Sequence, residues 1–201
     1  MAISKQQQKS LATKHKIFEA AKLILGRDGY ENLSIKNICQ ESGVSNGSFY
    51  HHFKTKDDLL SYYIEEQPYL NEDSFVIPRS IQDIKDTILT IYNNYANYCK
   101  ELGPKFMANY YTPKNQSLNP KTRTIRNYPI NAAERYLEEA ILTKVVDFKD
   151  LEIEDITTDI RIIVIGNVFE WSMRNGTPDI NRNIARSLST YLDGLLNKYK
   201  L

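Results

Sequence analysis

A short stretch of small polar side chains has the clearest capacity for molecular recognition in this sequence. It offers two serines, an asparagine, a tyrosine and a histidine, at Ser45, Asn46, Ser48, Tyr50 and His51. Gly47 lies among them and keeps the backbone slim enough for a partner to approach closely. Hydroxyl and amide groups hydrogen-bond to base edges and phosphate oxygens, and the stretch holds no acidic residue that would repel phosphate. These residue types therefore indicate a surface that meets nucleic acid.

The charge of the chain is uneven along its length. Residues 1–56 hold nine Lys and Arg against four Asp and Glu, whereas residues 57–201 hold 17 against 21. The net charge of all 201 residues is only +1. A basic head on a mildly acidic body favours a head that binds a polyanion.

The segments around the polar stretch predict three helices. Apolar residues at helical spacing predict the first over residues 10–27. Ser34 is expected to cap a second helix that runs to about residue 41, and Ser45 a third. Gly43 lies in the tight turn between these two and is the expected residue of positive φ. Two short helices joined in this way form a helix-turn-helix, in which the second helix enters the major groove of DNA.

The sequence of this region resembles the DNA-binding domain of the TetR family of repressors. The similarity runs without a gap through residues 34–60, with Gly-Val-Ser at 43–45 and Gly-Ser-Phe-Tyr at 47–50 in register. Upstream, residues 16–21 and Gly29-Tyr30 match the family's first helix and its end. About 50 of the 201 residues are covered, and the rest resembles the family only in length and in its helical pattern.

The resemblance implies DNA contacts at the polar stretch and at flanking residues. The expected DNA-binding residues are Ser34, Lys36, Ser45, Asn46, Gly47, Ser48, Tyr50, His51 and Lys56. Ser34 and Lys56 match positions that hold phosphates, and Lys36 matches one that reaches a base edge or the backbone. Asn46, Gly47 and Ser48 fall where bases are read, and Tyr50 and His51 fall on backbone or thymine-methyl contacts. Asn46 replaces a frequent Lys, and its amide would favour adenine.

The remaining chain predicts an all-α fold, because helical spacing continues almost to the C-terminus and no alternating strand pattern occurs. We expect a three-helix helix-turn-helix DNA-binding domain over residues 1–56. It would be joined to a helical ligand-binding and dimerisation domain over residues 57–201.

The last two predicted helices carry more apolar residues than one face of a small bundle needs. In the TetR family the corresponding pair forms a four-helix dimer interface, which implies a homodimer here. The interface candidates are Ile160, Val164, Val168, Leu188, Tyr191, Leu192 and Leu195. The alternative, that these residues are core within one chain, stays open. A two-fold dimer would bind a palindromic operator.

The sequence contains 14 tyrosines, and aromatic residues concentrate in the middle of the predicted body. Because tyrosine combines an apolar ring with a hydroxyl, it suits a pocket for an aromatic or amphipathic small molecule. The ligand-binding candidates are Tyr92, Tyr95, Phe106, Tyr110, Tyr128 and Trp171. The alternative is that these rings fill the core with their hydroxyls reaching solvent.

The other reactive residue types do not converge on a catalytic or metal site. His51 and His52 are neighbours on a predicted helix and point apart, and His15 is the only other histidine. Cys39 and Cys99 lie sixty residues apart, which gives neither a disulfide framework nor a metal spacing. No GxSxG, CxxC or phosphate-binding glycine loop occurs. We therefore expect no enzyme, no metal and no cofactor.

The cysteine usage favours a reducing, intracellular setting. The polar N-terminus is unlike a secretory signal, and the longest apolar stretch, residues 162–169, is too short to cross a bilayer. The expectation is a cytoplasmic, homodimeric repressor that binds double-stranded operator DNA and is released by a small-molecule effector. The alternative is a regulator that acts as an activator or through a protein partner, with the body as a binding module.

Overall fold

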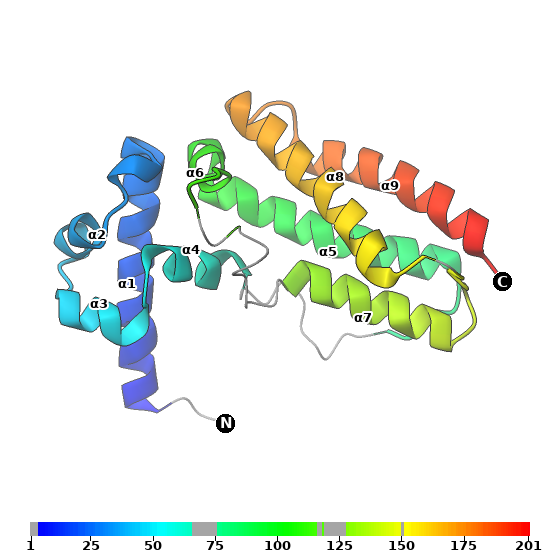
Figure 1. Cartoon of the computed structure of the whole chain (residues 1–201), viewed down its shortest axis with the longest axis horizontal. Coiled ribbons are helices and arrows are strands. Elements are labelled where there is room, and N and C mark those ends of the chain that lie inside the picture. Colours follow the sequence, from blue (N-terminus) through cyan, green and yellow to red (C-terminus); the bar gives the residue numbers. More distant parts are fainter. Residues whose placement is uncertain (1–3, 66–75, 116–117, 119–127, 150) are drawn as a thin grey trace. The chain divides into compact units, whose positions relative to one another are not determined.

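The computed structural model describes residues 4–65, 76–115, 118, 128–149 and 151–201, and every regular element in them is a helix (Figure 1). The elements are α1 (Lys5–Asp28), the short 3-10 helix η1 (Tyr30–Asn32), α2 (Ile35–Ser42), α3 (Asn46–His52), α4 (Lys56–Glu65), α5 (Ile81–Leu102), α6 (Pro104–Tyr110), α7 (Tyr128–Leu142), α8 (Ile153–Met173) and α9 (Ile180–Tyr199). The predicted all-α class is confirmed. Among these described helices, none combines the length and apolar character that crossing a membrane requires.

The chain divides into two compact units. Unit 1 comprises residues 1–64 and 105–125, and unit 2 comprises residues 65–104 and 126–201. Nearly all of α6 therefore belongs to unit 1, although it follows directly on α5 of unit 2. The functional division expected between residues 56 and 57 stays a prediction.

Helix α1 begins at Lys5, five residues before the predicted start. Ser4 caps it, because its hydroxyl accepts the backbone N–H of Gln7 at 3.2 Å while the Gln7 side chain accepts the Ser4 N–H at 2.8 Å. This reciprocal pair is a capping box, which satisfies two backbone donors at a helix start. The buried residues of α1 begin only at Ile17, so its first turns extend beyond the core.

The core of unit 1 forms where α1 meets the following short helices and α6. Six residues of α1 are buried, namely Ile17, Phe18, Ala20, Ala21, Ile24 and Leu25. The Phe18 ring meets Phe106 of α6 edge-on at 6.3 Å between centroids, and Phe106 stacks on Tyr110 at 6.2 Å. These aromatic contacts make α6 part of the same hydrophobic core as α1.

A side chain of α6 also satisfies the end of α1. Asn109 donates through Nδ2 to the Leu25 carbonyl at 3.1 Å. Gly29 ends α1 at φ +79°, and a Cβ there would lie 3.2 Å from the Asn109 Oδ1. Glycine is therefore suited to this position both by its backbone conformation and by the space that Asn109 needs. An ion pair between Lys114 and Glu31 adds an exposed link within unit 1.

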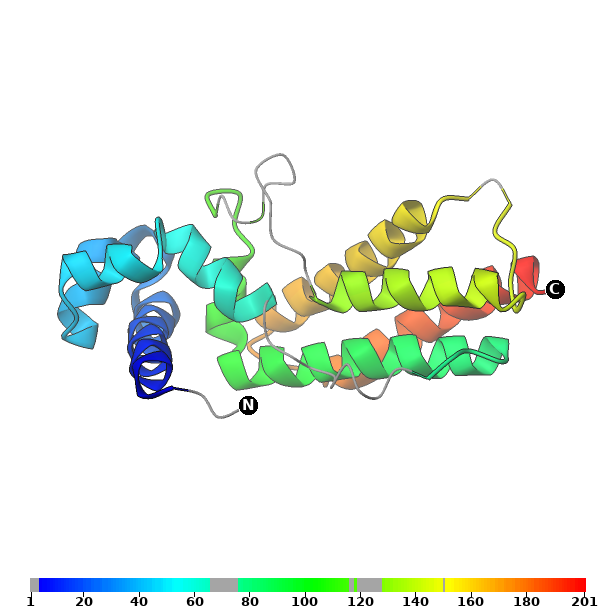
Figure 2. The same cartoon turned by 90° about the horizontal axis from the view of Figure 1, so that it is seen from below.

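Unit 2 is a helical bundle in which α5 packs along α7 and α9, and α8 packs along the same two helices (Figures 1 and 2). One face of α5 supplies much of the core, with Ile84, Ile88, Ile91, Tyr92, Tyr95, Ala96 and Cys99 buried. The steps of three and four between these residues place them on one side of a helix. Burial of this stripe against α7 and α9 holds the bundle together.

Candidate nucleic-acid interface

Helix α2 and the turn after it are fixed by local hydrogen bonds. The Ser34 hydroxyl accepts the Asn37 N–H at 3.1 Å and so caps α2, as predicted. Gly43 ends α2 in the left-handed conformation at φ +67°, which confirms the expected positive φ. The Val44 N–H then donates to the Cys39 carbonyl at 3.2 Å, which closes the turn. Cys39 is 7% exposed and packs in the core.

Helix α3 is anchored by two phenylalanines on its inner side. Phe49 is 0% exposed and Phe53, one turn later, is 5% exposed, with their ring centroids 5.9 Å apart. Burying a side chain of this size contributes roughly 1.5–3 kcal/mol. Ser45 starts the helix by accepting the Ser48 N–H at 3.1 Å. The cap and the two anchors together fix which face of α3 points outward.

The outward face carries the residues that the sequence singled out. Asn46, Gly47, Tyr50 and His51 are exposed, and Ser48 is half-buried. A Cβ at Gly47 would meet only the Ser45 hydroxyl, at 4.0 Å, so the fold itself does not require glycine there. The small size of Gly47 is therefore available to a partner approaching from outside. The structure brings these residues together on one face, and their contacts with DNA stay a prediction.

The two lysines assigned to this surface occupy different environments. Lys36 is exposed on α2. Lys56 is half-buried, and its ammonium donates to the Leu33 carbonyl at 2.9 Å and lies 3.9 Å from the centre of the Tyr30 ring. One of the three N–H groups of Lys56 is thus used within unit 1. Lys56 has a structural role that the sequence did not reveal, and two N–H groups remain for a phosphate.

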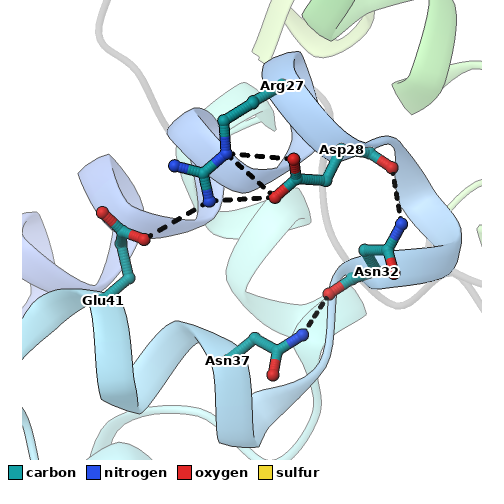
Figure 3. A network of polar contacts seen from close by, with 5 residues as sticks. All are labelled: Arg27, Asp28, Asn32, Asn37 and Glu41. Atoms are coloured by element: carbon teal, nitrogen blue, oxygen red, sulfur yellow. Dashed lines mark hydrogen bonds and ion pairs between the residues drawn. The ribbon is translucent and has the colours of Figure 1, made fainter.

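A polar network braces α2 against the end of α1 (Figure 3). Arg27 binds Asp28 at 2.9–3.0 Å and reaches Glu41 near the end of α2 at 3.5 Å. The side chain of Asn32 donates to the Asp28 carbonyl at 2.8 Å, and that of Asn37 donates to the Asn32 carbonyl at 2.9 Å. Exposed pairs of this kind contribute about 0–1 kcal/mol each, so they orient α2 more than they stabilise it.

The carboxylates nearest to α3 are engaged in internal contacts. Asp57 accepts the Tyr30 hydroxyl at 2.5 Å, and Asp58 accepts the Thr55 N–H at 3.0 Å. Arg27 lowers the pKa of Asp28 by its side-chain hydrogen bond, so this carboxylate stays ionised beside its partner. Burial, followed by the neighbouring His51 and Lys14, lowers the pKa of His52, which favours the uncharged form of its imidazole. The positive charge of this surface therefore comes from lysines and not from His52.

The geometry of unit 1 agrees with a comparison of the chain with protein families. Residues 17–63 match the family described as "Bacterial regulatory proteins, tetR family". The matched segment begins at the first buried residue of α1 and includes η1, α2 and α3 and most of α4. Residues 17–63 belong to the TetR family. Its description is that of bacterial regulatory proteins.

Curated relatives match less than half of the chain. The Transposon Tn10 TetC protein of Escherichia coli is 27% identical over 93 residues, which are 46% of this chain and 47% of that protein. The match thus spans about half the length of this relative.

Solved structures extend the likeness of fold to nearly the whole chain. A putative TetR-family transcriptional regulator from Rhodococcus sp. has a TM-score of 0.64 at 15% identity, covering 92% of this chain and 99% of that one. The transcriptional regulator FadR from Bacillus subtilis, solved in complex with stearoyl-CoA, has a TM-score of 0.61 at 20% identity, covering 89% and 96%. At these identities the likeness concerns the fold alone.

The ligand-binding candidates divide between the two units. Phe106 and Tyr110 belong to unit 1, where each is 1% exposed in the core beside Phe18. Three others, Tyr92, Tyr95 and Trp171, are buried in unit 2. The side chain of Tyr128 lies outside the described residues. The structure thus brings Phe106 and Tyr110 together in unit 1 and places the three others in unit 2, and ligand binding by any of them stays a prediction.

Most of the dimer-interface candidates are buried inside unit 2 in this conformation. Five of them are at most 2% exposed and pack inside unit 2, namely Ile160, Val164, Val168, Leu188 and Leu192. These five pack in the core of a single chain, and their part in a dimer interface stays a prediction. Tyr191 and Leu195 are half-buried, and the Tyr191 hydroxyl donates to Asp159 of α8 at 3.1 Å.

A different face of α8 carries exposed apolar side chains that the sequence pattern did not single out. Ile162, Phe169 and Met173 are 60%, 46% and 63% exposed, and Gly166 lies among them with open space around it. The steps of four, three and four residues place these four on one stripe of the helix. This spacing was readable in the sequence, but the buried residues of α8 have the same periodicity on the opposite face.

The two lysines give a prediction about stability. Replacing Lys56 with Ala removes the hydrogen bond to Leu33 and the contact with the Tyr30 ring, and is expected to lower the free energy of unfolding by about 1–2 kcal/mol. Lys36→Ala is expected to change it by less than about 0.5 kcal/mol, because Lys36 is exposed. Urea unfolding followed by circular dichroism measures both variants. Equal stability of the two variants would contradict the structural role of Lys56.

Proposed function

We propose that this protein is a transcriptional repressor that binds a palindromic DNA operator as a homodimer and is released by a small-molecule effector. The observation that carries this proposal is the outward face of α3. It presents small hydrogen-bonding groups free of carboxylates, on a helix that Phe49 and Phe53 hold in one orientation. The match of residues 17–63 to the TetR family supports the same function.

Affinity and specificity would come from different residues of unit 1. Lys36 supplies an exposed charge for phosphate, and the Ser34 hydroxyl keeps its proton to donate after it has capped α2. Such backbone contacts position the protein without reading the sequence. Asn46 supplies an exposed amide suited to adenine, and the Tyr50 ring, 57% exposed, supplies an apolar surface for a thymine methyl group.

A second copy of the chain is the proposed occupant of the exposed stripe on α8. Its apolar residues Ile162, Phe169 and Met173 face solvent in a single chain. Gly166 lets a partner helix approach closely, because no atom lies within 4 Å of its Cβ position. A two-fold axis through this stripe would provide the two copies of α3 that successive major grooves on one side of the DNA require.

The effector would act through the path of the chain between the units. Helix α5 of unit 2 leads through Gly103 directly into α6, which packs on α1 in unit 1. A molecule that binds one arrangement of unit 2 better than another would thus bias the placement of α6. Only this difference in affinity shifts the equilibrium between DNA-bound and free protein. The FadR structure solved in complex with stearoyl-CoA supports a small-molecule effector for this chain.

DNA binding is tested by fluorescence anisotropy of a labelled duplex from the region upstream of the protein's own gene, with random-sequence competitor, at two salt concentrations. Wild-type protein is expected to bind tightly in the presence of competitor. Lys36→Gln is expected to weaken binding and to reduce the slope of log K against log[salt] by about 0.9 for each phosphate that the variant no longer neutralises. Lys149→Gln, which removes the same charge from unit 2, is the control. Equal slopes for both variants would contradict the assigned surface.

Dimerisation is tested by analytical ultracentrifugation. Phe169→Glu places a charge in the centre of the proposed interface, and is expected to raise the dimer dissociation constant at least about 30-fold. Leu142→Glu changes a side chain that is 74% exposed on α7, outside the stripe, and is expected to leave the constant unchanged. A dimer that tolerates Phe169→Glu as well as Leu142→Glu would place the interface elsewhere.

A further inference from the structure

A cluster of polar side chains lies inside unit 2, where α5, α7 and α8 meet. Its members are Tyr92 of α5, Glu134 of α7, and Thr157 and Arg161 of α8. Tyr92 and Thr157 are 3% and 2% exposed, whereas Glu134 and Arg161 are half-buried. The two half-buried residues therefore connect the buried hydroxyl groups with the solvent.

The Tyr92 hydroxyl has no hydrogen-bond partner anywhere in the part of the chain that the structure describes. A buried hydroxyl without a partner has lost its hydration and gained nothing in exchange. Most buried polar groups of folded proteins have a partner, so an exception calls for a physical explanation. A bound molecule that supplies the missing partner is such an explanation.

Two other tyrosines of this chain show what Tyr92 lacks. Tyr30 donates its hydroxyl to Asp57 at 2.5 Å, and Tyr191 donates to Asp159 at 3.1 Å. Tyr92 makes no such bond with Glu134. The pKa of its hydroxyl is nevertheless raised, mainly by burial and also by the negative charge of Glu134. The Glu134 carboxylate thus lies within electrostatic range of Tyr92 but beyond hydrogen-bond contact. A group of the right size would bridge the two.

The charged members of the cluster are also incompletely used. The Glu134 carboxylate lies 3.4 Å from the Thr157 hydroxyl, whose one proton is shared with the Glu154 carbonyl at 3.2 Å. Arg161 forms no ion pair with any described residue. Its positive charge lowers the pKa of Tyr92, whereas the negative charge of Glu134 raises it. The cluster therefore holds one negative and one positive charge, with a net charge of zero.

We propose that this cluster binds the uncharged polar group of the small-molecule effector, a hydroxyl or primary amide that both donates and accepts hydrogen bonds. This inference rests on the proposed function. The group would donate to the Glu134 carboxylate and pair with the Tyr92 hydroxyl. A charged group would be attracted by one of Glu134 and Arg161 and repelled by the other, so little net attraction would offset the cost of removing its charge from water. An uncharged group avoids that cost.

The rest of the ligand would be apolar. The residues one turn from the cluster on each helix are buried and hydrophobic, including Ile88 and Ala96 on α5, Leu137 on α7 and Val164 on α8. A molecule with an apolar body and one hydroxyl, such as 2-phenylethanol, reproduces this chemistry and serves as the probe.

The unpartnered hydroxyl is tested first in the ligand-free protein. Tyr92→Phe removes a buried group that lacks a partner, and is expected to raise the melting temperature by roughly 2–4 °C. Tyr191→Phe, in the same unit, removes a hydroxyl that is hydrogen-bonded, and is expected to give no rise. A lower melting temperature for Tyr92→Phe would show that the hydroxyl is already satisfied, which would overturn the inference.

The chemical class is tested with three probes of matched shape at pH 7, namely 2-phenylethanol, 2-phenylethylamine and phenylacetate. In titrations followed by NMR chemical shifts, the alcohol is expected to bind at least about five-fold more tightly than either charged probe. Tyr92→Phe is expected to weaken the alcohol by about five-fold and to leave the charged probes unchanged. Equal binding of all three probes, or alcohol binding that Tyr92→Phe does not alter, would overturn the inference. Neither experiment contains DNA, so its failure is distinguishable from failure of the operator-binding experiment.

Discussion

The burial of Phe49 and Phe53 is the constraint on which the candidate DNA surface depends. These two rings, one helical turn apart, fix the rotation of α3 about its axis and leave Asn46, Gly47 and Tyr50 outside. A helix of seven residues has little stability of its own, so its orientation must come from tertiary packing. Phe53 also packs against Tyr62 of α4 at 5.7 Å between ring centroids, which extends the anchor into the next helix. The chemistry of the outer face is useful only because the inner face is rigid.

A second feature is the membership of α6 in unit 1. The chain leaves unit 1 after α4, builds α5 in unit 2, and returns to unit 1 with α6. Asn109 then closes the free carbonyl of Leu25 at the end of α1, and Phe106 packs on Phe18. Helix α5, which carries Tyr92, is thus joined by Gly103 alone to a helix that belongs largely to unit 1. This connection would give the proposed effector a physical means to influence α1 and the helices packed on it.

Sequence reasoning succeeded where local chemistry decides the structure. The caps at Ser34 and Ser45 and the positive φ of Gly43 are short-range signals, and each is observed. Sequence reasoning was less successful where tertiary packing decides which residues are buried. Helix α8 is apolar on both sides, so periodicity alone did not separate the buried Val164 from the exposed Phe169. The internal contacts of Lys56 with Leu33 and Tyr30 bring together residues at least 23 positions apart, and no local pattern announces them.

The most direct test of the central claim is a selection of binding sites from random DNA duplexes by the wild-type protein and by Asn46→Ala. The wild type is expected to enrich a palindromic site with two half-sites, because two copies of α3 would read the major groove. Asn46→Ala is expected to relax the preference at one position in each half-site, at a cost of about 1–3 kcal/mol per contact, while the remaining positions persist. Failure to enrich any common site, or an identical site for both proteins, would contradict the assignment of α3 as the helix that reads DNA.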